Sequence, residues 1–392
     1  MIKQPLFVAL LSIPFLAAPV VYLLGRTSLR KGRVWGMSLA RILTALVLLA
    51  EMVLTYLNVR RSLATNGVML EVGNVTLLLD GVFLTLTSIV LVLGFCVTLF
   101  SIPYMAKEKG EEKFYALLLM TIGSIIGLGA TFDLFNLWVW FEAMAISTYF
   151  LVAFYNEQPA SLEAGIKYLV QSAAGSALVL FGIAAIYVSL GTTSLSDLHA
   201  YSSMIGGFGI IGVVLMIVGF GVKAALVPLH TWLPDAHSQA PSGISAMLSG
   251  IVIEAGLVAM LRTISMVAGL GVNWGVVLIG FACLNILVGN LMALRQTEVK
   301  RLLAYSSLAH IGYMLFGFGV AFAFTSVDSV TGAFFHMMTH GLMKGLAFLA
   351  AGALLYALHL AKGDHSPLTL DDLNGASRKY PLIAVGLSIA VL

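Results

Sequence analysis

The chain has 392 residues, of which 60% are hydrophobic and only 10% are charged, against about 45–50% and 25% in ordinary soluble domains. Its mean hydropathy is +1.00. A soluble domain needs a charged exterior, so this composition excludes a soluble enzyme, a disordered tail and a nucleic-acid-binding protein. The net charge of +3 does not indicate a nucleic-acid partner, because the basic residues lie in short clusters between apolar runs, as in membrane proteins.

The apolar runs predict an all-α membrane protein, because a spanning helix needs about 20 mostly apolar residues. We expect a multi-span bundle with eleven complete spans and a truncated twelfth, which begins at Pro381, so that the chain is a fragment. The eleven runs lie near 6–24, 37–59, 79–102, 114–132, 134–155, 166–190, 205–229, 242–268, 272–294, 302–324 and 330–360.

Lysine and arginine predict the orientation, because basic residues favour the inner side of a membrane. With the N-terminus outside, fifteen basic residues lie at inside ends and loops, including the loops 103–113 and 361–380. The four that would lie outside are Lys3, Arg60, Arg61 and Arg262. This bias predicts an outside N-terminus.

Four ionisable side chains lie well inside apolar runs: Glu142, Lys223, Glu254 and Lys344. A charge at the centre of a spanning helix costs about 2.5–3.5 kcal/mol, so such residues indicate function by default. The alternative is that they form structural ion pairs between helices. Glu51 also lies inside a span, but it has no companion motif, and we expect a structural role for it.

Lys223 lies in the segment GFGVKAALVPLHTWLPDAH, residues 219–237. Pro228 has no N–H group, so the carbonyl of Ala224 loses its helical partner and the helix is expected to break just after Lys223. A lysine beside such a break is well placed to exchange protons with water. The alternative is an ordinary proline kink, with the lysine held by a partner acid.

His336, His340 and Lys344 follow one another at a spacing of four residues, which places them on one helix face. Neutral imidazole both donates and accepts hydrogen bonds, so the stripe favours a proton relay. A metal site would need a third ligand of matching geometry, which is not evident. His310 is one more candidate in the preceding span.

The two cysteines, Cys96 and Cys283, lie far apart inside apolar runs and form no CxxC pair. We therefore expect no iron–sulfur, zinc or thiol redox site, no cofactor and no metal in this chain. A self-sufficient oxidoreductase is disfavoured for the same reason.

Four blocks, in this order, resemble the signatures of the antiporter-like membrane subunits of respiratory complex I, multisubunit sodium/proton antiporters and membrane-bound hydrogenases. The blocks are FNLWVWFEAM at 135–144, VKAALVPLHTWLPDAHSQAPSGISAMLSG at 222–250, VKRLLAYSSLAHIGYM at 299–314 and FHMMTHGLMKGLAFLAAGAL at 335–354. The resemblance covers roughly residues 75–392.

The resemblance implies a fourteen-helix fold with two inverted five-helix repeats, of which the last helices are missing here. It divides the single transmembrane domain into N-terminal helices at 1–113, a first repeat at 114–268 and an incomplete second repeat at 269–392. It also implies proton or sodium translocation in a bacterial or archaeal cell membrane, driven by redox chemistry in partner subunits.

The resemblance also assigns roles to residues. Glu142 takes the place of the acid that controls the neighbouring lysine, and Lys223 that of the protonatable lysine on the broken helix. The relay positions fall on His336, His340 and Lys344, with His310 at a weaker polar position.

One position departs from the family. Members commonly carry a lysine in the eighth helix, where this chain has Glu254. A carboxylate is able to ligate Na⁺, which a lysine is not. We therefore expect an ion-translocating subunit of a complex I-like or hydrogenase-like complex. The alternatives are a cation/proton antiporter subunit without redox chemistry and a structural subunit with an inactive path.

Overall fold

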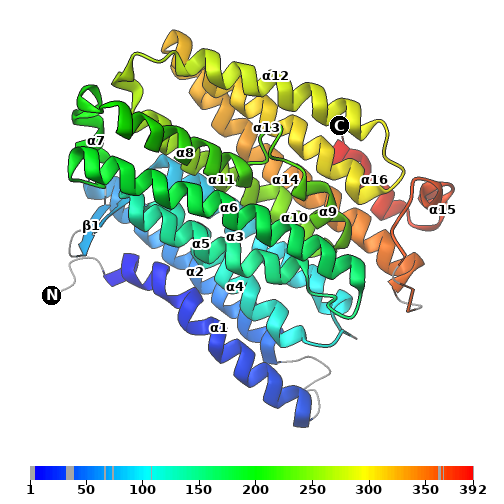
Figure 1. The fold of residues 1–392 in the computed structure, drawn as a ribbon. Helices are drawn as coiled ribbons and strands as arrows, with labels where there is room; N and C mark the ends of the chain where they lie inside the picture. Colours follow the sequence, from blue (N-terminus) through cyan, green and yellow to red (C-terminus); the bar gives the residue numbers. More distant parts are fainter. Residues whose placement is uncertain are drawn as a thin grey trace.

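The computed structural model describes residues 5–31, 39–65, 68–72, 75–106, 108–360, 363–364 and 366–391. Long helices that run along a common direction make up nearly all of the fold, which confirms the all-α membrane prediction (Figure 1). Ten helical segments of the described chain are long and apolar enough to cross a membrane. They are α1 (Pro5–Lys31), α2 (Leu39–Thr65), α3 (Gly81–Tyr104), α4 (Glu111–Ala130), α5 (Leu134–Val152), α6 (Pro159–Leu190), the segment Ser242–Met266, α12 (Trp274–Ala293), α13 (Val299–Phe324) and α14 (Val327–Leu358).

The expected run at 205–229 is not one complete span. It consists of α8 (Gly207–Lys223), which has 17 residues, and an irregular segment that leads to the short helix α9 (Trp232–Gln239). The count of eleven complete spans is therefore not confirmed within the described residues. The helix expected from Pro381 is present as α16 (Pro381–Val391).

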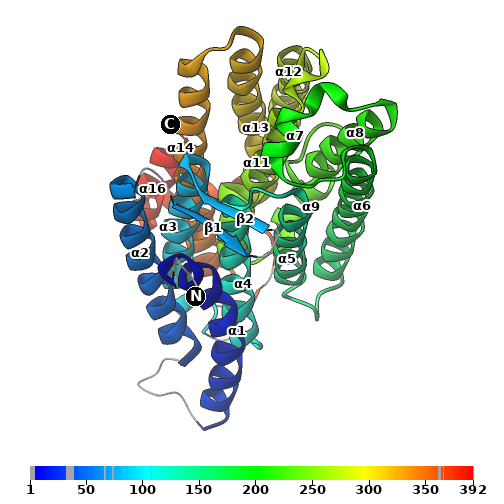
Figure 2. The same ribbon diagram turned by 90° about the vertical axis from the view of Figure 1, so that its left-hand side faces the viewer.

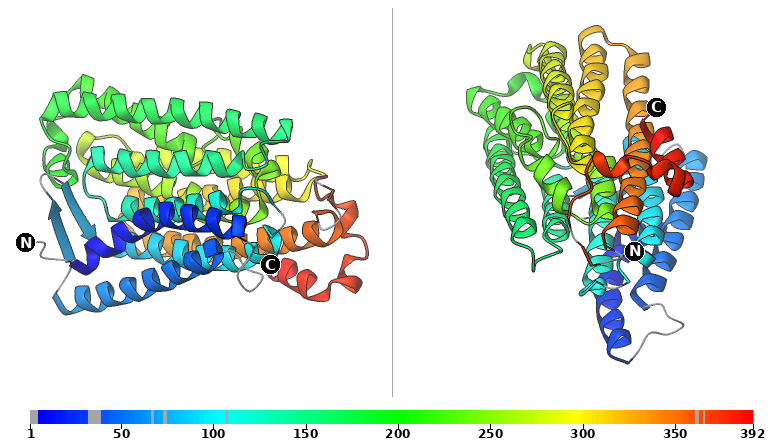
Figure 3. Two further views of the ribbon diagram at one scale, coloured as in Figure 1. Left: turned by 90° about the horizontal axis from the view of Figure 1, so that it is seen from below. Right: turned by 90° about the vertical axis from the view of Figure 1, so that its right-hand side faces the viewer.

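The stretch before α3 holds a β-hairpin that the sequence analysis did not predict. Strand β1 (Val68–Val72) pairs antiparallel with β2 (Val75–Leu79), and both lie close to the N-terminal end of α1 (Figure 2). The hairpin and α7 (Leu195–Ala200) lie at one end of the bundle, and α15 (Ala376–Lys379) lies at the other (Figures 1 and 3). Strand pairing satisfies backbone groups that no helix satisfies here.

A fully buried helical segment runs through the centre of the bundle. It comprises α10 (Ser242–Met247), a π-helical turn (Leu248–Val252) and α11 (Ile253–Met266), and its apolar window is 100% buried. A π-helical turn interrupts the regular ladder and often marks a functional site. We call Ser242–Met266 the central helix.

Two buried ion pairs join helices near the ends of the bundle. The guanidinium of Arg41 on α2 donates two hydrogen bonds to Glu111 on α4, one of them 2.9 Å long. Near the opposite end, Arg262 of the central helix pairs with Asp80 at 3.0 Å. Of the basic residues used for the orientation, Lys3, Arg33, Lys107 and Lys362 lie outside the described residues.

The orientation predicts which loop positions react with reagents added from outside. Lys109 lies in a predicted inside loop and is 89% exposed, and Met204 lies in a predicted outside loop and is 71% exposed. In a background lacking Cys96 and Cys283, Met204→Cys should react with an impermeant thiol reagent added to intact cells, whereas Lys109→Cys should react only after lysis. The opposite pattern would reverse the topology.

Candidate functional site

The helix break predicted beside Lys223 is present, because α8 ends at this residue. The freed backbone groups are satisfied by side chains. Trp232 Nε1 donates to the carbonyl of Val222 at 2.8 Å, and the N–H of Val227 donates to Asn285 Oδ1 at 2.9 Å. Asn285 is fully buried on α12 and also donates to a carbonyl within the break at 3.2 Å. This anchor explains how irregular backbone persists inside the bundle.

The ammonium of Lys223 is buried among neutral groups. Its Nζ donates to the hydroxyl of Tyr168 and lies 3.4 Å from Thr148 Oγ1 and 4.6 Å from the centre of the Tyr168 ring. Tyr168 in turn stacks on Trp232, with 4.3 Å between the ring centres. No carboxylate of the described chain lies within ion-pair distance of Lys223. The alternative in which a partner acid anchors the lysine directly is therefore not what the structure shows.

Glu142 is connected to Lys223 through α6. Its carboxylate, which is half-buried on α5, accepts a hydrogen bond from Ser176, and Trp138 Nε1 donates to the same hydroxyl at 2.9 Å. Ser176 and Tyr168 are eight residues apart on α6 and so share one face of that helix. Ser176 contacts Glu142, and Tyr168 contacts Lys223. The pair is thus bridged by α6.

Glu254 and His340 form the centre of the second cluster. His340 Nδ1 lies 2.7 Å from Glu254 Oε1, and both side chains are fully buried. Their second polar atoms, Glu254 Oε2 and His340 Nε2, have no hydrogen-bond partner among the described residues. Each therefore retains a free position through which a proton can be gained or lost.

Glycines allow the helices that carry these groups to approach closely. A Cβ atom at Gly250 would lie 2.9 Å from the carbonyl oxygen of Gly341 on α14, next to His340. A Cβ atom at Gly256 would lie 2.8 Å from the backbone nitrogen that follows Lys223. Small residues at both contacts let backbones meet. The central helix, which carries Glu254, therefore packs against α8 at Lys223 and against α14 next to His340.

The stripe on α14 faces α13, as its spacing predicts. His336 Nε2 lies 3.1 Å from His310 Nδ1, and the rings of His310 and His340 have centres 5.1 Å apart. Lys344 Nζ donates to Ser306 Oγ at 2.6 Å. The structure thus gathers Glu254 and all four predicted residues of α13 and α14 into one cluster.

His237 is a buried polar residue that the sequence analysis did not select. It lies on α9, stacks on Phe348 at 4.7 Å, and neither ring nitrogen has a hydrogen-bond partner among the described residues. Burial, reinforced by the positive charges of Lys300 and Lys344, lowers the pKa of His237 to about 3. Its imidazole is therefore neutral at physiological pH. The sequence contained one sign of its importance, because His237 lies inside the block at residues 222–250 that resembles a family signature.

The short helix α9 is held by Asp235. The carboxylate accepts hydrogen bonds from Arg301 at 2.6 Å and Lys167 at 3.2 Å. Burial alone would raise the pKa of Asp235, but these two cations outweigh it and hold the pKa below its ordinary value. The carboxylate therefore stays charged and ties α9 to α6 and α13.

Glu51 lies outside these clusters. It is fully buried on α2, which packs against α1, α3 and α4. Its carboxylate oxygens have no partner in the described part of the chain, so no ion pair there supports the structural role we expected.

Across the described residues, no group of three or more His, Cys, Asp or Glu side chains is arranged to hold a metal ion.

Residues 131–392 match the family model described as "NADH:quinone oxidoreductase/Mrp antiporter, TM", and residues 70–115 match that of "NADH-Ubiquinone oxidoreductase (complex I), chain 5 N-terminus". The chain belongs to this antiporter-like family. The match begins at the loop before α5, so it covers the helices that carry both clusters.

Curated relatives of this chain come from archaea and bacteria. It is 33% identical to F(420)H(2) dehydrogenase subunit N of Methanosarcina mazei, over 81% of this chain and 64% of the relative. It is 33% identical to NADH-quinone oxidoreductase subunit N of Trichlorobacter lovleyi, over 74% of this chain and 59% of the relative. It is 32% identical to hydrogenase-4 component B of Escherichia coli, over 74% of this chain and 44% of the relative. The chain thus spans less than two thirds of the length of each relative.

Two solved structures share the fold. A chain of an archaeal membrane-bound sulfane sulfur reductase superposes with a TM-score of 0.87 at 28% identity, over 98% of this chain and 77% of that one. A chain of respiratory complex I from Thermus thermophilus superposes with a TM-score of 0.70 at 27% identity, over 96% of this chain and 76% of that one. Both neighbours belong to membrane complexes, as the sequence analysis expects for this family.

The anchor at the helix break predicts a specific loss of stability. Asn285→Ala removes two buried hydrogen bonds and leaves backbone groups near Val227 unpaired, which costs about 1–3 kcal/mol for each unsatisfied group. The purified variant in detergent should unfold at a clearly lower temperature than the parent. The control is Asn290→Ala on an exposed position of the same helix, which should unfold like the parent. Equal unfolding temperatures for both variants would contradict the anchoring role.

Proposed function

We propose that this chain is an ion-translocating membrane subunit of a complex I-like NADH:quinone oxidoreductase or a related hydrogenase, and that its ion is the proton. The observation that carries the proposal is the buried series of protonatable groups from Glu142 and Lys223 through Glu254 to the α13–α14 cluster. Redox chemistry belongs, in this proposal, to partner subunits. The relatives are subunits named for an F(420)H(2) dehydrogenase, an NADH-quinone oxidoreductase and a hydrogenase, which supports the same class of complex.

Glu142 controls the charge of Lys223 in this mechanism. A carboxylate near a buried lysine favours the ammonium, whereas burial alone favours the neutral amine. Neutral hydroxyls of Tyr168 and Thr148 surround the lysine, so Glu142 is the charge whose movement or neutralisation alters the balance. When that influence weakens, the ammonium loses a proton and becomes an amine.

Glu254 is the next acceptor in the proposed path, because the helix that carries it touches the backbone of Lys223 at Gly256. A carboxylate that takes up the proton becomes a carboxylic acid, and His340 lies in hydrogen-bond contact with it. From His340 the relay continues through His310 and His336 to the region of Lys344. The replacement of the family's usual lysine by Glu254 leaves this sequence of donors and acceptors intact.

The second candidate is a cation/proton antiporter subunit without redox chemistry, possessing the same path. The observation that favours it is the Glu254 carboxylate, an oxygen ligand of the kind that hard cations prefer. Its neighbour, however, is an imidazole nitrogen at 2.7 Å, which suits proton transfer better than sodium binding. Transport measured in sodium-free buffer separates the two candidates, because a proton path needs no sodium.

The Glu142–Lys223 coupling is tested by single and double substitutions. Glu142→Gln should favour neutral Lys223 and lower proton uptake to a small residual rate, and Lys223→Met should lower it to a similar extent. Because the two residues act as one switch, the double variant should be about as impaired as either single variant. The measurement is proton uptake into vesicles that contain the assembled complex. Losses that multiply would instead indicate separate structural roles, and normal uptake in Lys223→Met would end the proposal.

The Glu254–His340 contact is tested in the same vesicles. His340→Ala and Glu254→Gln should each lower proton uptake roughly tenfold or more, since each removes a proton-transfer group. The adjacent variant Thr339→Ala, on the exposed side of α14, serves as the matched control and should pump at the parent rate. Parent-level pumping in both test variants would exclude the relay. Failure of His340→Ala to assemble, with normal assembly of the control, would favour a structural role.

A further inference from the structure

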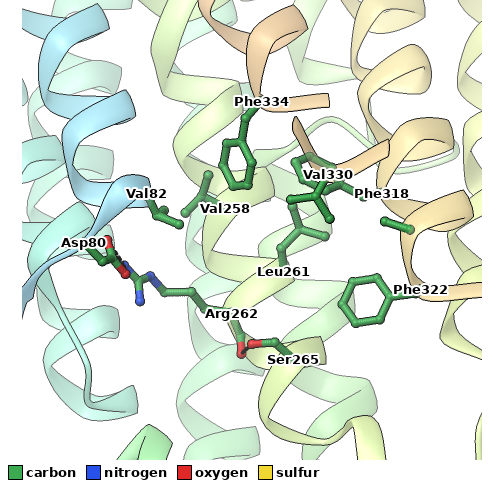
Figure 4. Close-up of a pocket in the computed structure, with 11 residues that line it drawn as sticks. Asp80, Val82, Val258, Leu261, Arg262, Ser265, Phe318, Phe322, Val330 and Phe334 are labelled. Atoms are coloured by element: carbon green, nitrogen blue, oxygen red, sulfur yellow. Dashed lines mark hydrogen bonds and ion pairs between the residues drawn. The ribbon is translucent and has the colours of Figure 1, made fainter. Parts of the chain in front are cut away.

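An apolar cavity of about 310 Å³ lies near the predicted outer end of the bundle. It is bounded by the central helix, α13, α14 and the start of α3 (Figure 4). Its walls carry hydrophobic side chains, including Val258, Leu261, Phe318 and Phe334. Such walls exclude a polar solute and suit a hydrocarbon chain.

One end of the cavity is polar. Arg262 extends from the central helix toward Asp80, and its Nη2 donates to both oxygens of that carboxylate and to the carbonyl of Gly129 (Figure 4). The side chain is 9% exposed, and its Nε is buried without an acceptor among the described residues. Asp80 and the Gly129 carbonyl therefore do not saturate the five N–H donors of the guanidinium.

Asp80 supplies the opposite charge at the same place. Its side chain is 27% exposed, and Oδ1 also accepts the N–H of Phe83 at 2.7 Å as the cap of α3. Together Asp80 and Arg262 are formally neutral. A headgroup with net negative charge gains little from such a pair, whereas a headgroup with one positive and one negative group is complementary to it.

The cavity opens between α13 and α14, beside side chains that are exposed in the structure. Val330, at the start of α14, is 37% exposed, and Phe322 of α13 is partly exposed beside it. Both belong to helices that cross the membrane. A molecule of the outer leaflet can therefore place its chain between α13 and α14 and its headgroup beside Arg262.

We propose that this cavity binds a zwitterionic phospholipid of the phosphoethanolamine class. One acyl chain lies against Leu261 and Phe334, a phosphate oxygen accepts from Arg262, and the ammonium group lies beside Asp80. The bound chain wedges α14 against the central helix about two turns from Glu254. The lipid thus positions the two helices that carry the Glu254–His340 contact, although the binding itself does not depend on ion translocation.

The test uses the purified complex, reconstituted with a phosphatidylethanolamine that carries a photoreactive diazirine in one acyl chain. Irradiation and peptide mass spectrometry should place adducts on the cavity-lining segments of α13 and α14. Val330→Trp fills the mouth and should lower these adducts several-fold. Val327→Trp is the matched control, since this residue is 76% exposed on the same helix outside the cavity, and it should leave the yield unchanged. Ala321→Phe fills the cavity from α13 as a second blocking variant.

The headgroup is tested by competition with unlabelled lipids. Ethanolamine lipid should compete better than anionic phosphatidylglycerol for the parent protein. Asp80→Asn keeps a capping side chain on α3 but removes the negative charge, so the preference should shift toward phosphatidylglycerol by roughly threefold to tenfold. Adducts absent from the cavity, adducts insensitive to Val330→Trp, or a neighbouring subunit cross-linked into the cavity would overturn the proposal. An unchanged preference in Asp80→Asn would overturn the headgroup assignment.

Discussion

The burial of the central helix around Glu254 is the constraint on which the site depends. Because this side chain is fully buried, its carboxyl must find its partners within the protein. Gly250 and Gly256 remove the side chains that would hold the neighbouring backbones away. The contacts with α14 and α8 follow: Glu254 lies against His340, and Gly256 of the same helix lies against the backbone at Lys223. A larger residue at Gly250 would push α14 away, and one at Gly256 would push α8 away.

The broken helix is a second consequence of burial. A proline inside the bundle interrupts the helix, and this fold satisfies backbone groups of Val222, Ala225 and Val227 at the break with an amide from α12 and an indole from α9. The indole of Trp232 also stacks on Tyr168, whose hydroxyl accepts from Lys223. The groups that stabilise the irregular backbone are therefore the same groups that hold the lysine, so the break and the protonatable residue form one structural unit.

Local pattern in the sequence predicts part of this arrangement. The lengths of the apolar runs predict most of the spanning helices, and Pro228 predicts the end of α8 at Lys223. The spacing of His336, His340 and Lys344 predicts that they share one face of their helix. Contacts between distant segments leave no such pattern. Asn285, Ser176 and Tyr168 are ordinary polar residues in spanning helices, and their roles depend on which helix lies opposite. The indirect connection of Glu142 to Lys223 escaped prediction for the same reason. The β-hairpin is a local structure, and it escaped prediction because it lies almost wholly between two of the expected apolar runs, 37–59 and 79–102.

Charge is held differently at the ends of the bundle and at its centre. At the ends, Arg41 and Arg262 each make paired hydrogen bonds to a carboxylate, and an arginine does not lose its proton at any physiological pH. At the centre, the partners of Lys223 and Lys344 are neutral hydroxyls, and the partner of Glu254 is an imidazole. Such partners tolerate a change of protonation, because a hydroxyl or an imidazole is able to donate as well as accept. Fixed pairs at the ends can thus maintain the helix packing while charges at the centre change, and this division is what an ion path inside a stable bundle requires.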